Sequence, residues 1–154
     1  MPNRIERIVA ITPVAPAGMG LDAATKDLFR SLALAGDEER YATLCSLWGA
    51  RLSETWIRHK LRRWRETASP AAVAKYVDLW GSTEISQGAR GIETPMLIVA
   101  AAQDAPPFQA AALEASMLPF YSNARLISLG ESGHYPMQEQ PPLLATAIER
   151  FLRE

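Results

Sequence analysis

The chain has 154 residues, of which 48% are hydrophobic and 21% charged, and its 16 basic and 17 acidic residues give a net charge of −1. This is the composition of one globular domain, and it excludes disordered and fibrous architectures. The low net charge argues against a protein that is held to nucleic acid by a positive field. No apolar run reaches the ~20 residues that span a bilayer. No secretory segment follows Met1–Arg4, so we expect a cytoplasmic protein with no membrane contact.

Two residues that often carry chemistry are expected to be structural. Cys45 is the single cysteine, so an internal disulfide is excluded and a zinc site would need other ligands. We expect its side chain to be buried in a helix. His59 lies in a segment rich in arginine and lysine, which is typical of a solvated basic helix face. The alternative is a phosphate or nucleic-acid patch, because Trp56 and Trp64 lie between the charges.

Three short apolar segments are predicted to be β-strands: Ile5–Thr12, Met96–Ala101 and Ala124–Leu129. The middle segment does not alternate between apolar and polar residues, which is typical of a strand covered on both faces in a parallel sheet. Parallel strands need crossover connections, and helices are predicted over Phe108–Met117 and from Pro141 onward. The apolar residues of the last helix follow helical spacing and are expected to form one buried stripe against the sheet: Leu144, Ala147, Ile148, Phe151 and Leu152. The predicted fold class is therefore α/β, with about three parallel strands and flanking helices.

The segment from about Asp22 to Gln87 contains no predicted strand and is expected to be helical, with caps at Asp37, Ser53 and Ser69. Such a long insertion exceeds what a crossover between two strands requires, so we expect a helical lid over one end of the sheet. The predicted organisation is a first core strand and loop at 1–21, a helical cap at 22–88 and a C-terminal core at 89–154, all in one structural domain.

One acidic and one imidazole side chain directly follow two of the predicted strands. Asp104 comes just after Met96–Ala101, and His134 comes just after Ala124–Leu129. The carboxyl ends of parallel strands meet at the edge of the sheet where ligands bind. We therefore expect Asp104 to reach His134, to fix its tautomer and to stabilise the imidazolium that forms when it takes a proton. The structural alternatives are that Asp104 caps the next helix and that His134 is a turn residue.

These segments resemble the α/β-hydrolase family. The strand that leads to that family's triad acid is similar to Ile92-x-Thr94-Pro95-x-Leu97-Ile98-Val99-x-x-x-x-Asp104. Its catalytic-histidine turn and final helix are similar to Ser132-Gly133-His134-Tyr135-Pro136-Met137-x-Glu139-x-Pro141. Arg7–Pro13 resembles the strand that follows the nucleophile helix, and residues 22–87 lie where the family inserts its cap. The resemblance implies that Asp104 and His134 are the acid and the base of a catalytic triad.

One part of the family's pattern is absent from the sequence. The nucleophile of the family lies on a G-x-S-x-G elbow that precedes the acid and the histidine, and no segment of the 154 residues fits it. Ser132 lacks both the spacing and the strand-to-helix context. The resemblance places the elbow, together with the oxyanion donors, upstream of Met1, so that the chain corresponds to the back half of a hydrolase.

The first predicted strand gives an independent expectation. If it is an internal strand of the intact fold, Ile8–Ile11 would present unpaired N–H and C=O groups along an uncharged edge. Such an edge pairs or aggregates. We therefore expect a partner strand, either from a complementary N-terminal half or from a second copy of the chain.

The first hypothesis is a half-enzyme that hydrolyses an ester or a related acyl substrate once a second polypeptide supplies the nucleophile and the oxyanion hole. No metal or organic cofactor is implied by this chemistry. A small apolar substrate is favoured by the aromatic residues of the expected cap, of which one or two could line a pocket: Tyr41, Trp48, Trp56, Trp64, Tyr76 and Trp80. Two alternatives stay open: a non-catalytic binding or assembly module derived from a hydrolase, and a truncated fragment of a full-length hydrolase.

Overall fold

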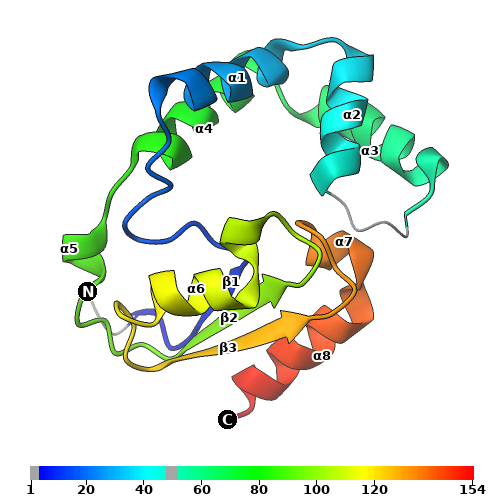
Figure 1. The fold of residues 1–154 in the computed structure, drawn as a ribbon. Helices are drawn as coiled ribbons and strands as arrows, with labels where there is room; N and C mark the ends of the chain where they lie inside the picture. Colours follow the sequence, from blue (N-terminus) through cyan, green and yellow to red (C-terminus); the bar gives the residue numbers. More distant parts are fainter. Residues whose placement is uncertain (1–3, 48–51) are drawn as a thin grey trace.

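The computed structural model describes residues 4–47 and 52–154 (Figure 1). At its centre lies a parallel sheet in the order β1 (Ile8–Ile11), β2 (Met96–Ala101) and β3 (Ala124–Leu129). The predicted positions of β2 and β3 are confirmed. The first strand is shorter than the predicted Ile5–Thr12, because its pairing with β2 covers only Ile8–Ile11.

Helices cover both faces of the sheet. On one face, alternate residues of β1 and β2 pack against α6 (Ala110–Met117), and on the other face the remaining residues pack against α8 (Pro141–Leu152) (Figure 1). β2 is completely buried, which explains why its sequence does not alternate. β1 has apolar neighbours on both faces too, although it is the last strand of the sheet on its side.

Two predictions about these helices need correction. The helix predicted from Phe108 begins at Ala110, because Pro106–Phe108 form a separate 3-10 turn, η2. In α8, Leu144 and Phe151 are buried as predicted, but Leu152 is 54% exposed. Leu152 lies about 80° around the helix from Leu144, so it falls at the margin of the face that meets the sheet.

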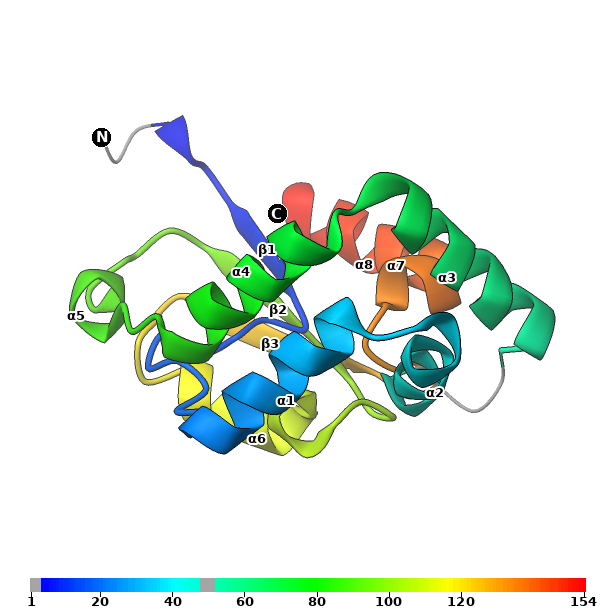
Figure 2. The ribbon, with the colours of Figure 1, turned by 90° about the horizontal axis from the view of Figure 1, so that it is seen from above.

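The predicted helical insertion consists of five helices in the described part of the chain: α1 (Ala23–Leu34), α2 (Asp37–Leu47), α3 (Glu54–Thr67), α4 (Pro70–Ser82) and α5 (Ser86–Ala89). α1 packs against α4, and α2 packs against α3. Seen from above, α1 and α4 run side by side across the sheet (Figure 2). None of the helices in these described ranges is long and apolar enough to cross a membrane.

The helix caps follow the sequence with one exception. Ser53 and Ser69 accept hydrogen bonds from the N–H groups of the first turns of α3 and α4, as predicted. Asp37 is not the cap of α2 but its first residue. Gly36 takes the capping position, and its N–H donates to the Glu39 carboxylate at 3.2 Å. The Asp37 side chain is thereby left to pair with Arg65 at 2.8 Å.

Candidate active site

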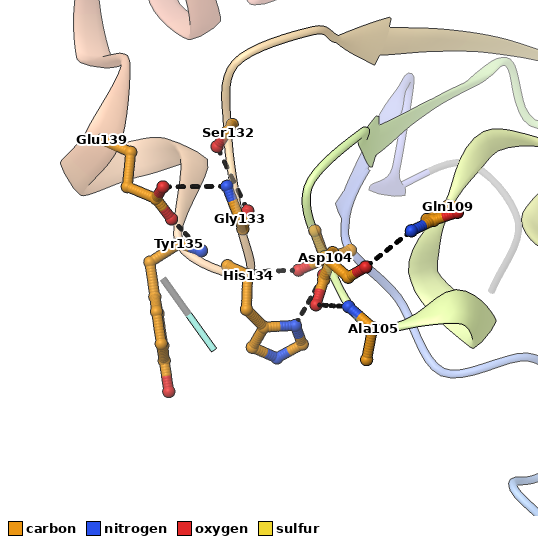
Figure 3. A network of polar contacts seen from close by, with 9 residues as sticks. Asp104, Ala105, Gln109, Ser132, Gly133, His134, Tyr135 and Glu139 are labelled. Carbon is orange, nitrogen blue, oxygen red and sulfur yellow. Dashed lines mark hydrogen bonds and ion pairs between the residues drawn. The ribbon is translucent and has the colours of Figure 1, made fainter. Parts of the chain in front are cut away.

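The ends of β2 and β3 bring Asp104 and His134 into direct contact (Figure 3). Nδ1 of His134 lies 2.8 Å from Oδ2 of Asp104. The Asp104 side chain has 0% exposed surface, whereas the His134 side chain is 25% exposed. The second imidazole nitrogen, Nε2, has no hydrogen-bond partner among the described residues. One side of the ring is therefore fixed to a buried carboxylate, while the other ring nitrogen makes no hydrogen bond to the described residues.

The buried carboxylate of Asp104 has a partner for each oxygen. Oδ1 accepts the N–H of Ala105 at 2.6 Å, while Oδ2 faces His134. The main-chain carbonyl of Asp104 accepts the side-chain amide of Gln109 at 2.8 Å, which ties the loop to the start of α6. These bonds offset the cost of removing a charge from water. Because the carboxylate can only accept, it orients the imidazole with its proton on Nδ1 and leaves Nε2 as a proton acceptor.

Glu139 holds the turn that carries His134. This residue ends the short helix α7 (Pro136–Glu139), and its two carboxylate oxygens accept N–H groups on either side of the histidine (Figure 3). Oε2 is 2.8 Å from the nitrogen of Gly133, and Oε1 is 3.0 Å from the nitrogen of Tyr135. In the sequence, Glu139 stands out only as one position of the motif that resembles the histidine turn of the family. The sequence signal for its role in holding the turn is an acidic residue six positions after Gly133.

Thr12 reaches the same turn from the end of β1. Its hydroxyl donates to the carbonyl oxygen of His134 at 3.3 Å, and its N–H donates to the carbonyl of Val99 at 2.9 Å. Thr12 also has a φ of +42°, the one positive φ of a non-glycine residue in the described ranges. Sequence reasoning did not identify this residue. All three strand ends therefore contribute to the surroundings of His134.

Two aromatic rings flank the imidazole. The ring centre of Phe108 lies 4.8 Å from that of His134, and the ring centre of Tyr135 lies 5.2 Å from it, both in edge-to-face orientation. Burial, together with the charges of Asp104 and Glu139, raises the pKa of the Tyr135 phenol. The phenol is therefore protonated at neutral pH, and the imidazole has largely apolar neighbours.

A cavity of about 350 Å³ lies between α3 and the histidine turn. Its lining includes Trp64 and Tyr135 but neither Asp104 nor His134. Tyr135 lines this cavity and also contacts the imidazole of His134. Most other cap aromatics serve packing: Trp56 and Tyr41 join the cluster of α2 and α3, and Trp80 contacts Phe29. Trp48, the remaining tryptophan of the cap, lies outside the described residues.

His59 and Cys45 do not join the site. His59 is exposed on α3 and stacks on Trp56, as expected for a solvated face. Three arginines of α3 pair with nearby acids, as Arg58–Glu54, Arg63–Glu66 and Arg65–Asp37. The prediction that Cys45 is buried is wrong: it is exposed, because the preceding residue of α2, Leu44, faces α3 instead. The described part of the chain contains no group of three or more potential metal ligands.

The fold matches solved structures over nearly the whole chain. A hydrolase from Pseudomonas aeruginosa PA01 shares 24% identity with a TM-score of 0.76, and covers 98% of this chain and 57% of its own. A thermophilic esterase from Thermogutta terrifontis shares 20% identity with a TM-score of 0.77, over 99% of this chain and 57% of its own. An α/β-hydrolase from a Medee basin deep-sea metagenome library shares 20% identity with a TM-score of 0.71, over 99% of this chain and 58% of its own.

The chain thus spans between 57% and 58% of the length of these three proteins. No protein-family model and no curated protein matches the sequence. The parallel sheet, its flanking helices and the helical insertion nevertheless superimpose on enzymes of one architecture. The chain therefore has the fold of part of an α/β-hydrolase.

Proposed function

We propose that this chain carries the proton-transferring acid and base of a hydrolase that acts on ester or related acyl substrates. The observation that carries the proposal is the contact between the buried carboxylate of Asp104 and Nδ1 of His134, in a partly exposed imidazole whose Nε2 has no hydrogen-bond partner among the described residues. In such a pair the imidazole takes a proton from an attacking hydroxyl, and the carboxylate stabilises the resulting imidazolium. His134 then returns the proton to the leaving group. This chemistry requires no metal or organic cofactor.

The attacking group comes, in this proposal, from a segment outside the 154 residues. Their sequence contains no G-x-S-x-G elbow. Ser132 is no substitute, because it has 0% exposed surface and its hydroxyl donates to the carbonyl of Gly133 at 3.1 Å. β1 supports a further strand beside it, since both of its faces are covered while its outer edge is unpaired among the described residues.

A small apolar acyl group is the substrate class that the surroundings of His134 favour. The rings of Phe108 and Tyr135 lie against the imidazole, and neither carries a charge at neutral pH. Two of the structurally similar proteins are a hydrolase and an esterase. We therefore propose ester hydrolysis as the reaction to test first.

The test measures hydrolysis of a short-chain p-nitrophenyl ester. It uses the chain alone and the chain mixed with the part of the Pseudomonas aeruginosa hydrolase that the chain does not match. We expect turnover only in the mixture, and a loss of about 10³-fold or more in His134→Ala. His59→Ala is the matched control, because His59 is an exposed histidine outside the site and its removal leaves turnover unchanged. Turnover that survives His134→Ala contradicts the proposal.

The open edge of β1 favours a second candidate, a binding or assembly module without catalysis. This function predicts that the chain associates with itself or with a partner through Ile8–Ile11, with no hydrolysis in any mixture. Sedimentation of the chain over a range of concentrations, beside the ester assay, separates the two candidates.

A further inference from the structure

Thr12 adopts a backbone conformation that its residue type disfavours twice. Its φ of +42° lies in the left-handed region, where a β-branched side chain is strongly disfavoured. It also precedes Pro13, and a residue before proline is restricted to extended conformations. The other positive φ angles in the described ranges belong to glycines: Gly18, Gly20 and Gly91. A glycine at position 12 would adopt this conformation without strain, so the threonine side chain calls for a different explanation.

The contacts of Thr12 supply that explanation. Its hydroxyl donates to the carbonyl oxygen of His134, a residue 122 positions later in the sequence, at 3.3 Å. Its N–H donates to Val99 at 2.9 Å, which anchors Thr12 to β2. Thr12 is only 9% exposed, so water has little access to this hydroxyl. The strained residue thus connects the end of β1 to the backbone of the histidine.

We infer that Thr12 is a positioning residue for His134. The Asp104 carboxylate fixes Nδ1 of the imidazole, and the Thr12 hydroxyl fixes the carbonyl of the same residue. These two anchor points, which follow the ends of β2 and β1, hold the ring against rotation and displacement of the turn. They therefore set the direction of Nε2. This inference rests on the proposed role of His134 as the base. It goes further by identifying the end of β1 as a second element that holds this base in place.

The first measurement needs no nucleophile. In NMR spectra of the chain, the His134 Nδ1 proton is identified as the imidazole resonance that disappears in Asp104→Ala. We expect Thr12→Val, which removes the hydroxyl and keeps the shape, to speed exchange of this proton with water about three- to tenfold, the effect of one neutral hydrogen bond. Thr12→Ser keeps the hydroxyl and restores slow exchange. Thr146→Val is the matched control, since the Thr146 hydroxyl donates to the carbonyl of Pro142 on the exposed face of α8.

Thr12→Gly separates positioning from strain. It removes the hydroxyl and also relieves the unfavourable φ, so it folds even if Thr12→Val does not. We expect fast exchange of the Nδ1 proton in Thr12→Gly despite a stability equal to or above that of the parent. An unchanged exchange rate in Thr12→Gly overturns the inference. Fast exchange in Thr12→Ser overturns it too.

The ester assay provides a second, independent measurement. In the active mixture, Thr12→Val lowers kcat by about three- to tenfold with KM unchanged, and Thr12→Ser restores kcat. An unchanged kcat in Thr12→Val contradicts the inference. If no mixture hydrolyses the ester, the proposed function fails, and the exchange rate still decides the role of Thr12. If the mixture is active and exchange is unaffected by these variants, the function stands and the role of Thr12 is refuted.

Discussion

The carboxylate of Asp104 lies entirely inside the protein, while the imidazole of His134 that it contacts reaches the surface. The pair is therefore asymmetric, because Asp104 is inaccessible to solvent and contacts His134 from inside the protein, whereas His134 is partly exposed. A pair that served only to stabilise the fold would not need an imidazole whose second nitrogen has no partner among the described residues. The asymmetry also gives the two residues different expected effects on stability.

Asp104→Ala is expected to lower the free energy of unfolding by about 1–3 kcal/mol. The N–H of Ala105 and the Nδ1 proton of His134 both lose their acceptor in a buried place. Asp78→Ala is the control, because the Asp78 carboxylate pairs with Arg30 at the surface, where such pairs contribute about 0–1 kcal/mol. Urea unfolding of the three proteins measures both effects. Equal losses in the two variants contradict the structural role of Asp104.

Glu139→Gln is expected to cost about 1–3 kcal/mol of stability. The glutamate accepts two main-chain N–H groups, from Gly133 and Tyr135, but a glutamine has only one acceptor oxygen and turns an NH₂ group toward the other donor. In Glu149→Gln, the same change affects only an exposed pair with Arg153 at 3.1 Å, so its effect stays within about 0.5 kcal/mol. Thermal unfolding of the parent and of both variants measures these two losses of stability. A neutral Glu139→Gln would show that the histidine turn does not depend on this carboxylate.

The buried Arg40 in the cap gives a prediction of opposite sign. Its side chain is 1% exposed, its Nε and Nη2 have no hydrogen-bond partner among the described residues, and its guanidinium lies 4.0 Å from the ring centre of Trp64. Burial, with the nearby charge of Arg65, lowers the pKa of Arg40. Removing a buried, poorly satisfied charge while keeping the length of the side chain is neutral or stabilising. Arg40→Met is therefore expected to leave stability equal or higher.

Arg65→Met is the control for Arg40. The Arg65 guanidinium donates to Asp37 at 2.8 Å and to the carbonyl of Ala35 at 2.6 Å, so its loss costs about 1–2 kcal/mol. Urea unfolding measures both variants. A loss of more than about 1 kcal/mol in Arg40→Met contradicts the argument that the charge of Arg40 is a cost.

The raised pKa of Tyr135 predicts how stability responds to alkaline pH. An unfolded tyrosine ionises near its ordinary pKa of 10.0, while the folded phenol keeps its proton to higher pH. Between these two values the folded state binds more protons than the unfolded state, so stability falls as pH rises. In Tyr135→Phe this contribution is absent and the decline is shallower. Urea unfolding from about pH 8 to pH 11 measures the difference, and parallel curves for parent and variant contradict it.

Asp104 and His134 could be placed together from sequence because each follows shortly after a segment with the composition of a strand, Met96–Ala101 and Ala124–Leu129. Parallel strands end at one edge of a sheet, so consecutive strand ends predict neighbouring side chains. Thr12 could not be found in this way. Its contact requires a positive φ at a β-branched residue before proline, which local rules argue against. Strain of this kind is visible only once the tertiary contacts that hold it are known.

The other errors come from single-residue differences that a pattern does not resolve. Leu44 and Cys45 are adjacent on α2, and the rotation of the helix against α3 decides which of them is buried. The apolar pattern of the first strand begins before its pairing, because only Ile8–Ile11 lie opposite β2. Asp37 and Gly36 were both able to cap α2, and the return of the Glu39 carboxylate to Gly36 decided between them.

The outer edge of β1 gives the last prediction. The N–H groups of Ile8 and Thr12 donate toward β2, at 2.9 Å from the carbonyls of Pro95, directly before β2, and of Val99 within it. Since alternate residues of a strand face the same neighbour, the N–H of Val9 points to the unpaired edge. Val9→Pro removes that donor and leaves the bonds of Ile8 and Thr12 to β2 intact.

We therefore expect Val9→Pro to weaken docking of a partner strand, or of a second copy, by about tenfold, the equivalent of 1.4 kcal/mol. Val9→Ala is the control, because it also shortens the Val9 side chain, which packs on the cluster of α8, but keeps the N–H. Sedimentation of the chain alone and titration of the mixture by ester turnover both measure the association. If proline and alanine weaken it equally, packing on the face of β1 governs docking, and its open edge does not.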